Sequence, residues 1–135
     1  MTRTTLLALA ERVEAATSTE QREMLEAAFV AIHGPKPERV HGGSPEWLAW
    51  LDLHNPFFAL LQAGGFLDAA MSLVPSGDAW TVGQNVHHRH WVASINYLDN
   101  GEPKSRDGSN CASTPALALT AACLRARAIA GSLPD

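Results

Sequence analysis

The sequence predicts an α+β fold with N-terminal helices, a small antiparallel β-sheet of two to three strands and a closing C-terminal helix, in an α/β/α sandwich-like arrangement. Two changes of pattern support this class. Apolar residues follow a helical period as far as residue 74 and alternate with a period of two from residue 79. The helical period then returns after residue 114.

The length of 135 residues suits one ordinary domain, so we expect a single α+β domain over residues 1–135. No internal repeat and no low-complexity segment divides it. Three parts are expected within the domain. They are an N-terminal helical hairpin over residues 1–33, a loop and short aromatic helices over 34–65, and a helix, a β-hairpin and the closing helix over 66–131.

The first two helices have recognisable ends. Thr4 or Thr5 is available as the N-cap of the first helix. Ser18, with Gln21 three residues later, matches a capping box for the second helix, and Gly34 should end it. The expected apolar faces comprise Leu6, Leu9, Ala10, Val13 and Ala16 in the first helix, and Leu25, Ala28, Phe29 and Ile32 in the second.

The middle of the chain begins as a loop and continues as two short helices rich in aromatic residues. Ser44 should cap the first of them, with Pro45 at its first position, and Asn55 before Pro56 repeats the same start signal. The aromatic side chains are Trp47, Trp50, Phe57 and Phe58. Core packing, a surface for a partner protein and a platform for stacking a nucleotide base stay open as their roles.

A further helix and a hairpin follow. The helix spans residues 66–74, and two strands over 79–84 and 88–98 should pair antiparallel, turning near residues 85–88. Segment 99–113 is rich in turn formers, with room for one poor third strand at its end. The apolar face expected for the helix comprises Leu67, Ala70, Met71 and Val74.

The closing helix has a start signal and a stop signal. Thr114 should be its N-cap, with Pro115 at the first helical position, and Gly131 should end it. Arg125 and Arg127 near its C-terminus suit the negative end of the helix dipole. Its apolar stripe comprises Leu117, Ala121, Leu124 and Ala128.

The run HHRH in the predicted hairpin is the clearest cluster of chemically active side chains. Alternation places His88 and His90 on one face of the strand and Trp91 on the other, so the histidines face away from the expected core. Such a pair can supply two zinc ligands, but a third would have to come from His54, Asp52 or another distant position. An exposed hairpin end, a zinc site and a contact with an anionic ligand all stay open.

Arg89 lies between these histidines, on the core-facing side by strict alternation. A long cationic side chain in that place has to reach the edge of the sheet or leave it at the turn. Two interpretations of Arg89 therefore stay open, namely a contact with an anion and a solvated residue of the turn.

The composition narrows the classes of partner. A net charge of -4 with 10 Lys and Arg spread along the chain argues against duplex nucleic acid, whose phosphates bind clustered basic residues. No apolar run approaches the roughly 20 residues needed to span a bilayer. Glu11 and Glu14 interrupt the only stretch that resembles a signal peptide. We therefore expect no duplex nucleic acid, no membrane partner and no export.

The two cysteines form no CxxC pair. Cys111 is expected in a loop, and Cys123 is expected as a small buried hydrophobic residue of the closing helix. A reducing cytoplasm fits this usage best. We expect a cytoplasmic protein with no cofactor.

Two stretches resemble a known family. FLDAAMSLVPSGDAWTVGQ, at residues 66–84, and CASTPALALTAACLRARA, at residues 111–128, are similar to the phage ABA sandwich domain family of small phage and prophage proteins. The family pattern is a helix ending in a DAA and LVP phrase, a tryptophan-led strand, further strands and a closing TPALAL helix. The match extends over residues 66–98 and 111–128, and it implies a sandwich of helices and a small sheet.

The layout is also similar to phage anti-defence proteins of the Thoeris type, which sequester cyclic nucleotide immune signals without cleaving them. The resemblance implies a non-enzymatic protein in the cytoplasm of a bacterial host. Many relatives place an arginine in the closing helix where this chain has Ala121, while Arg125 lies one turn later.

We therefore expect a non-enzymatic phage or prophage protein that binds and sequesters a cyclic nucleotide-like small molecule as a homo-oligomer. The expected ligand contacts are Arg89, His88, His90, Arg125, Trp47 and Trp50. Two alternatives stay open. One is a protein–protein interaction module that docks through residues 47–58 without a small-molecule ligand, and the other is a zinc-dependent hydrolase that uses His88 and His90.

Overall fold

Five α-helices and a three-stranded antiparallel sheet make up the fold, which confirms the predicted α+β class. The computed structural model describes residues 2–38, 43–85, 89–99 and 102–129. The helices are α1 (Arg3–Ala15), α2 (Gln21–His33, preceded by a 3-10 turn at Ser18–Glu20), α3 (Pro45–Gln62), α4 (Phe66–Met71) and α5 (Pro115–Ile129). The strands are β1 (Ala79–Asn85), β2 (His90–Asp99) and β3 (Glu102–Ala112).

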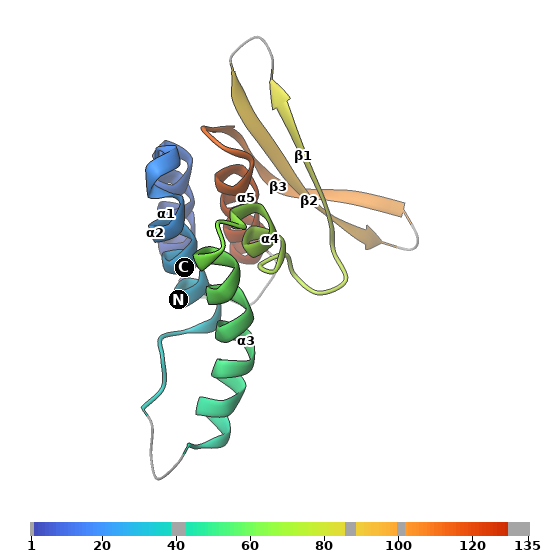
Figure 1. The fold of residues 1–135 in the computed structure, drawn as a ribbon. Coiled ribbons are helices and arrows are strands. Elements are labelled where there is room, and N and C mark those ends of the chain that lie inside the picture. The colour runs from blue at the N-terminus through green and yellow to red at the C-terminus, as the bar shows by residue number, and fades with distance from the viewer. Residues whose placement is uncertain (1, 39–42, 86–88, 100–101, 130–135) are drawn as a thin grey trace.

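The elements lie in layers. Figure 1 shows α1 and α2 on one side, α5 in the middle and the sheet on the other side, so the closing helix separates the other helices from the sheet. The short helix α4 packs against α5 and joins it to α3. The N-terminal end of α3 extends away from the rest of the molecule (Figure 1).

The helix starts near the N-terminus differ from the predicted ones by one to three residues. Thr2 rather than Thr4 or Thr5 caps α1, because its hydroxyl oxygen accepts the backbone N–H of Thr5 at 3.1 Å. The capping box is Thr17 with Glu20, whose carboxylate accepts the Thr17 N–H at 2.9 Å, and not Ser18 with Gln21. Several hydroxyl side chains compete at these positions, and local spacing alone does not decide among them. 

The end of α2 and the start of α3 match the sequence prediction. Gly34 ends α2 with a φ of 84°, a conformation that glycine adopts without strain. The Ser44 hydroxyl accepts the N–H of Trp47 at 3.2 Å, and Pro45 is the first residue of the helix.

The two short aromatic helices predicted in the middle of the chain are one continuous helix, α3, so the predicted break at Asn55 and Pro56 is wrong. Proline lacks the N–H that would bond to the carbonyl of Asp52. Asp52 and Pro56 are both exposed, so water can solvate that carbonyl in place of the missing bond. A proline on the solvent side therefore does not end this helix.

The helix α4 is shorter than predicted, and its buried face is shifted. Met71 is 38% exposed, whereas Ala69 and Leu73 are fully buried beside the correctly predicted Ala70. The helix ends at Met71, and directly after it the Ser72 hydroxyl donates a hydrogen bond to the backbone carbonyl of Ala69 at 2.6 Å. The helical spacing of apolar residues therefore does not predict which side chains are buried beyond Met71.

The predicted hairpin is confirmed, since β1 pairs antiparallel with β2 from Ala79 opposite Asn96 to Asn85 opposite His90. The third strand is longer than the poor strand that was predicted, because β3 spans eleven residues from Glu102 to Ala112. It is an edge strand, and its pairing with β2 shifts register twice. Edge position and register shifts are what accommodate the turn-forming residues of this segment.

The sheet turns one face toward α5. Ala93 and Ile95 of β2 are buried, while Trp80, Val82 and Trp91 pack against the same core and stay partly exposed. The burial of Trp80 and Trp91 is therefore only partial. The side chain of Tyr97 and the predicted terminator Gly131 lie outside the described residues.

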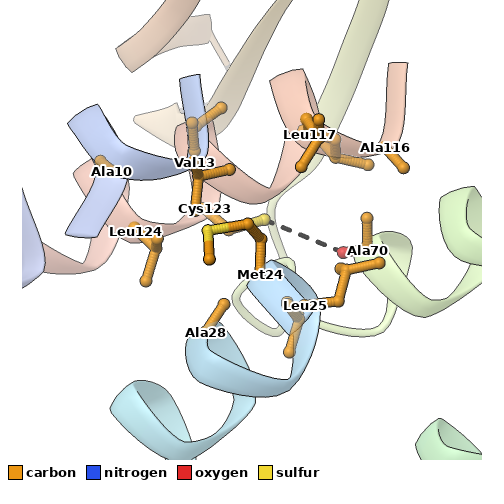
Figure 2. Close-up of a cluster of buried hydrophobic side chains, with 14 of the residues drawn as sticks. Ala10, Val13, Met24, Leu25, Ala28, Ala70, Ala116, Leu117, Cys123 and Leu124 are labelled. Carbon is orange, nitrogen blue, oxygen red and sulfur yellow. Dashed lines mark hydrogen bonds between the residues drawn. The ribbon is translucent and has the colours of Figure 1, made fainter. Parts of the chain in front are cut away.

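The core is built around α5. Thr114 caps it as predicted, accepting the N–H of Leu117 at 3.1 Å, and Pro115 begins the helix. Eleven of its fifteen residues are buried, far more than the single predicted stripe. Figure 2 shows side chains from four helices meeting there. They include Ala10 and Val13 of α1, Met24, Leu25 and Ala28 of α2, Ala70 of α4, and Ala116, Leu117, Cys123 and Leu124 of α5.

Small residues let other elements approach α5 from every side. Six of the buried positions on this helix are alanines, and the one buried hydroxyl, on Thr120, donates to the carbonyl of Ala116 at 2.7 Å. Such a helix has no polar face, so it can lie only at the centre of a domain. None of the described helices combines the length and apolar character needed to cross a bilayer.

An enlarged side chain on α5 should therefore destabilise the fold. We expect Ala122→Leu to lower the free energy of unfolding by about 1 to 3 kcal/mol, because a fully buried alanine leaves no space for three more carbons. Urea denaturation measures this loss. The same change at Ala59, on the exposed side of α3, should alter stability by less than about 0.5 kcal/mol. Equal effects at the two positions would contradict the central placement of α5.

Candidate functional site

A concave surface lies between α2 and α3, and we call it the α2–α3 groove. Its volume is about 380 Å³, within the range of about 300 to 1,000 Å³ typical of small-molecule sites. Most of its lining is apolar, with one carboxylate and one ammonium group. The lining residues are Glu26, Phe29, Val30, Pro35, Lys36, Trp50, His54, Phe57, Phe58 and Leu61.

One wall of the groove is a ladder of three rings on α3. Trp50, His54 and Phe58 are four residues apart, so a helix places them in a row on one side. The Trp50 and His54 ring centroids are 4.2 Å apart with planes at 14°, and those of His54 and Phe58 are 5.4 Å apart at 17°. The rings are thus stacked along the helix axis, and the inner ring faces are occupied by one another.

The floor of the groove joins the two helices. Phe29 of α2 stacks on Phe57 of α3 with centroids 4.8 Å apart, and both are 3% exposed. Phe29 also meets the ladder edge-on, with centroids 5.9 Å from Trp50 and 5.5 Å from His54. The Trp50 indole N–H donates to the carbonyl of Gly34 at 3.2 Å. These contacts fix α3 on α2 despite the long connection between them.

A cation lies at each end of the groove. The guanidinium of Arg22, near the start of α2, lies 5.5 Å from the ring centre of Phe58 and 3.4 Å from a carboxylate oxygen of Glu26. The ammonium of Lys36, beyond the end of α2, lies 4.8 Å from the ring centre of Trp47. The eleven residue-to-residue steps from Arg22 to His33, at the end of α2, correspond to about 16 Å of helix. The groove is therefore an apolar channel between two positive charges, one of them paired.

The residues predicted to contact a ligand lie in three places. Trp50 is in the groove, and Trp47 lies one turn before it with Lys36. Arg89 and His90 are exposed where β2 begins, and Figure 1 shows this end of the hairpin far from the N-terminal end of α3. His88 lies outside the described residues. The structure does not gather these side chains into one site.

Arg89 takes one of its two predicted positions. It lies at the turn with a φ of 55°, in the left-handed region, and its side chain is exposed. It therefore leaves the sheet at the turn rather than reaching its edge. Within the described part of the chain, no group of three His, Cys, Asp or Glu residues is placed to hold a metal ion.

Arg125, the remaining predicted contact, is part of an ion pair between α5 and α1. Its Nη2 bonds to the carboxylate of Glu14, and the two side chains are 20% and 11% exposed. The thiol of Cys111 donates to the other carboxylate oxygen of Glu14 at 3.8 Å, which joins β3 to the same pair. This cluster stabilises the junction of three elements.

The two thiols are poor nucleophiles. Cys111 lies in β3, not in the predicted loop, and burial together with the charge of Glu14 raises the pKa of its thiol. Cys123 is buried, as predicted, and burial raises the pKa of its thiol to about 12. A thiol has to ionise before it attacks, so both groups stay protonated near neutral pH.

The sequence does not predict the half of the groove that α2 and the residues after it form. Phe29 is predicted in the core, and Glu26, Val30 and Lys36, which line the same half, have no predicted role. The sequence contains one signal for this groove. Phe29 of α2 and the aromatic residues of α3 are large rings that a single short helix does not bury by itself. The pairing of the two helices depends on tertiary contacts.

The ion pair predicts a specific stability pattern. Arg125→Ala should lower the free energy of unfolding by about 2 to 4 kcal/mol, because it leaves the carboxylate of Glu14 in a largely buried place without its cation. The double variant Glu14→Leu with Arg125→Met should be more stable than Arg125→Ala, since it removes both charges of the pair and keeps apolar side chains in their place. Denaturant unfolding of the single and double variants tests this. An unchanged midpoint for Arg125→Ala would show that the pair contributes nothing.

A second prediction concerns pH. Burial, and then the charge of Arg127, lower the pKa of His33 below its ordinary 6.5. A depressed histidine pKa means that the folded state resists protonation, so this part of the stability is complete above about pH 6.5 and is lost as the pH falls below it. We expect wild-type protein to lose more stability on acidification than His33→Gln. Parallel unfolding curves for both proteins between neutral and mildly acidic pH would contradict this.

The chain was compared with protein-family models, curated proteins and solved structures, and none of the three comparisons gives a match. The resemblance to the phage ABA sandwich domain family therefore stays a prediction.

Proposed function

We propose that this chain is a non-enzymatic binding protein that holds a flat, anionic small molecule of the cyclic nucleotide class in the α2–α3 groove. The observation that carries the proposal is the ring ladder of Trp50, His54 and Phe58 facing the floor made by Phe29 and Phe57. Sequestration of a signal in a phage-infected or lysogenic bacterium is the role that agrees with the sequence resemblance.

The ring geometry favours an edge-to-face mode of binding. The ladder rings are stacked on one another, so a ligand in the groove meets their edges. Aromatic edges are electropositive and attract the electron-rich face of another ring. Phe29 already packs against the ladder in a T-shaped arrangement, with its ring at 85° to Trp50 and 75° to His54. A nucleobase lying along the ladder would repeat the same arrangement.

The charges at the ends of the groove favour an anionic ligand. Lys36 is exposed and lines the groove. An ammonium group acts as a point charge, so it can bind a nearby phosphate in any orientation. Glu26 opposes an anion, but Arg22 already pairs with this carboxylate at the same end. A ligand with an apolar flat centre and a phosphate directed toward Lys36 suits this distribution.

The proposal includes no chemical step. In the described part of the chain both thiols have a raised pKa, and none of the groove side chains forms a nucleophile–base pair of the kind that acyl or phosphoryl transfer requires. The proposal therefore expects that bound ligand leaves the groove chemically intact.

A second function, docking of another protein, is favoured by apolar side chains of α3 outside the groove. Leu48 and Leu53 are 55% and 50% exposed, and exposed apolar side chains can contact a partner protein. This alternative predicts that substitutions at Leu53 affect function, whereas the groove proposal predicts that they do not.

The groove proposal is tested by ligand-induced thermal stabilisation. Cyclic mononucleotides and cyclic dinucleotides of purines should raise the Tm, since a ligand at a hundred times its Kd stabilises the native state by about 2.7 kcal/mol. Phe58→Ala should weaken binding about two- to tenfold, in line with the about 0.5 to 1.5 kcal/mol that one edge-to-face aromatic pair contributes. Lys36→Gln should weaken binding of the nucleotides but not of the parent nucleosides.

The matched control is Leu53→Ala, an apolar truncation on the same helix outside the groove, which should leave ligand affinity unchanged. Ligand released by heating the complex should be identical to the ligand added, as judged by mass spectrometry. A hydrolysed product would point to an enzyme. No thermal shift with any of these nucleotides would leave the protein-docking function as the better account.

A further inference from the structure

The sheet has two free edges. Its strand order is β1-β2-β3, so within the part of the chain that the structure describes β1 and β3 each pair on one side only. A free edge exposes a row of backbone N–H and C=O groups that can pair with another strand, and soluble proteins usually protect such edges with charges, prolines or bulges.

The β3 edge is protected in all these ways. Its sequence contains Pro103, Lys104, Arg106 and Asp107, and its pairing with β2 shifts register twice. A proline removes a backbone donor, charged side chains discourage pairing with a second apolar strand, and register shifts twist the edge. This edge is therefore unsuited to pairing with another strand.

The β1 edge has none of these features. The strand AWTVGQN contains no charged residue and no proline, and its register with β2 is unbroken over seven residue pairs. Within the described residues, no backbone hydrogen bond joins 79–84 to any element other than β2. The contrast between the two edges of one small sheet indicates that β1 is kept available for pairing.

The packing of side chains next to this edge agrees with that interpretation. On the face toward the helices, Trp80 lies opposite Ile95 and Val82 lies opposite Ala93. The β2 partners are buried, but Trp80 and Val82 stay partly exposed, because no strand lies beyond them. A further strand at this edge would cover both side chains.

We propose that β1 pairs antiparallel with β1 of a second copy of this chain, so that two three-stranded sheets form one continuous six-stranded sheet. An uncharged strand is complementary to itself, since a two-fold axis brings no like charges together. With Val82 at the axis, Trp80 of each copy lies beside Gln84 of the other, and Thr81 lies beside Gly83 of the other. The interface does not involve the α2–α3 groove, so it stands independently of the ligand proposal.

The test places like charges across the proposed interface. Thr81→Lys combined with Gly83→Lys would put two lysine pairs directly opposite each other in the dimer, where like charges are destabilising. Within one chain both changes are tolerated, because Thr81 is exposed and a Cβ at Gly83 meets only Val92, at 4.0 Å.

The matched control is Ser94→Lys combined with Asn96→Lys. These residues lie on the central strand, opposite Thr81 and Ala79, so the control adds the same charge to the neighbouring strand of the sheet. The Thr81 and Ser94 hydroxyls share one hydrogen bond of 2.6 Å, which both double variants remove. Any difference between the variants therefore reports on the edge rather than on charge or on the lost bond.

Sedimentation velocity should show wild-type protein at twice the chain mass of 14.5 kDa. The Thr81 and Gly83 variant should dissociate at least about tenfold more readily, and the Ser94 and Asn96 control should keep the wild-type dimer. Hydrogen exchange should show β1 amides that gain protection as protein concentration rises, while β3 amides do not. Circular dichroism confirms that both variants are folded.

A wild-type protein of monomer mass at every concentration would overturn the proposal. So would a dimer that survives the Thr81 and Gly83 changes, because it would use another surface. A monomer whose β1 amides become protected only when an unrelated extended peptide is added would also overturn it, in favour of strand addition by a different partner.

Discussion

The structure depends on the complete burial of one helix. The closing helix α5 contacts α1, α2 and α4 on one side and all three strands on the other. Burial of a helix on every face requires small side chains where neighbours approach and a satisfied partner for each polar atom. Alanines meet the first requirement, and the bond from Thr120 to the carbonyl of Ala116 meets the second. The other helices have few contacts among themselves, so the positions of α1, α2 and α4 follow from how each packs on α5.

This central helix also explains why charges appear where they do. Arg125 and Arg127 emerge from the last turns of α5, and each has a fixed partner, the carboxylate of Glu14 and the carbonyl of Leu73 at 3.0 Å. A cation leaving a buried helix has to be compensated locally. These arginines therefore hold α1 and the segment after α4 against α5. The sequence contained no signal that Glu14, 111 positions away, is the partner of Arg125.

How far the sequence predicts the fold differs between local and tertiary features. The cap of α5 by Thr114 and the end of α2 at Gly34 were predicted correctly, because both depend on residues within one turn. The continuity of α3 through Pro56 was not predicted, because the free-energy cost of a proline inside a helix depends on whether the freed carbonyl faces water. The single apolar stripe predicted for α5 was an underestimate, because periodicity gives the direction of one neighbour and not the number of neighbours.

The same distinction applies to the candidate site. Trp47 and Trp50 were identified from their aromatic spacing, but the groove exists only because Phe29 of α2 meets α3 across a connection of more than ten residues. The hairpin histidines attracted attention as a chemical cluster, yet His90 lies at the exposed beginning of a strand. A local cluster in the sequence reports which chemistry is available, whereas packing decides which of it faces a cavity.

The two proposed surfaces differ in their relation to α5. The sheet packs on this helix directly, so its edges are held in fixed positions, and β1 can present an unbroken row of backbone groups. The helix α3 packs against α4 and against Phe29 of α2, whereas its N-terminal end extends away from the rest of the molecule and has fewer constraints (Figure 1). Regions with few buried contacts open at lower free energy than the core. A ligand that bridges α2 and α3 would therefore lose part of its binding free energy to the ordering of the free end of α3, whereas pairing at β1 would join two surfaces that are already rigid.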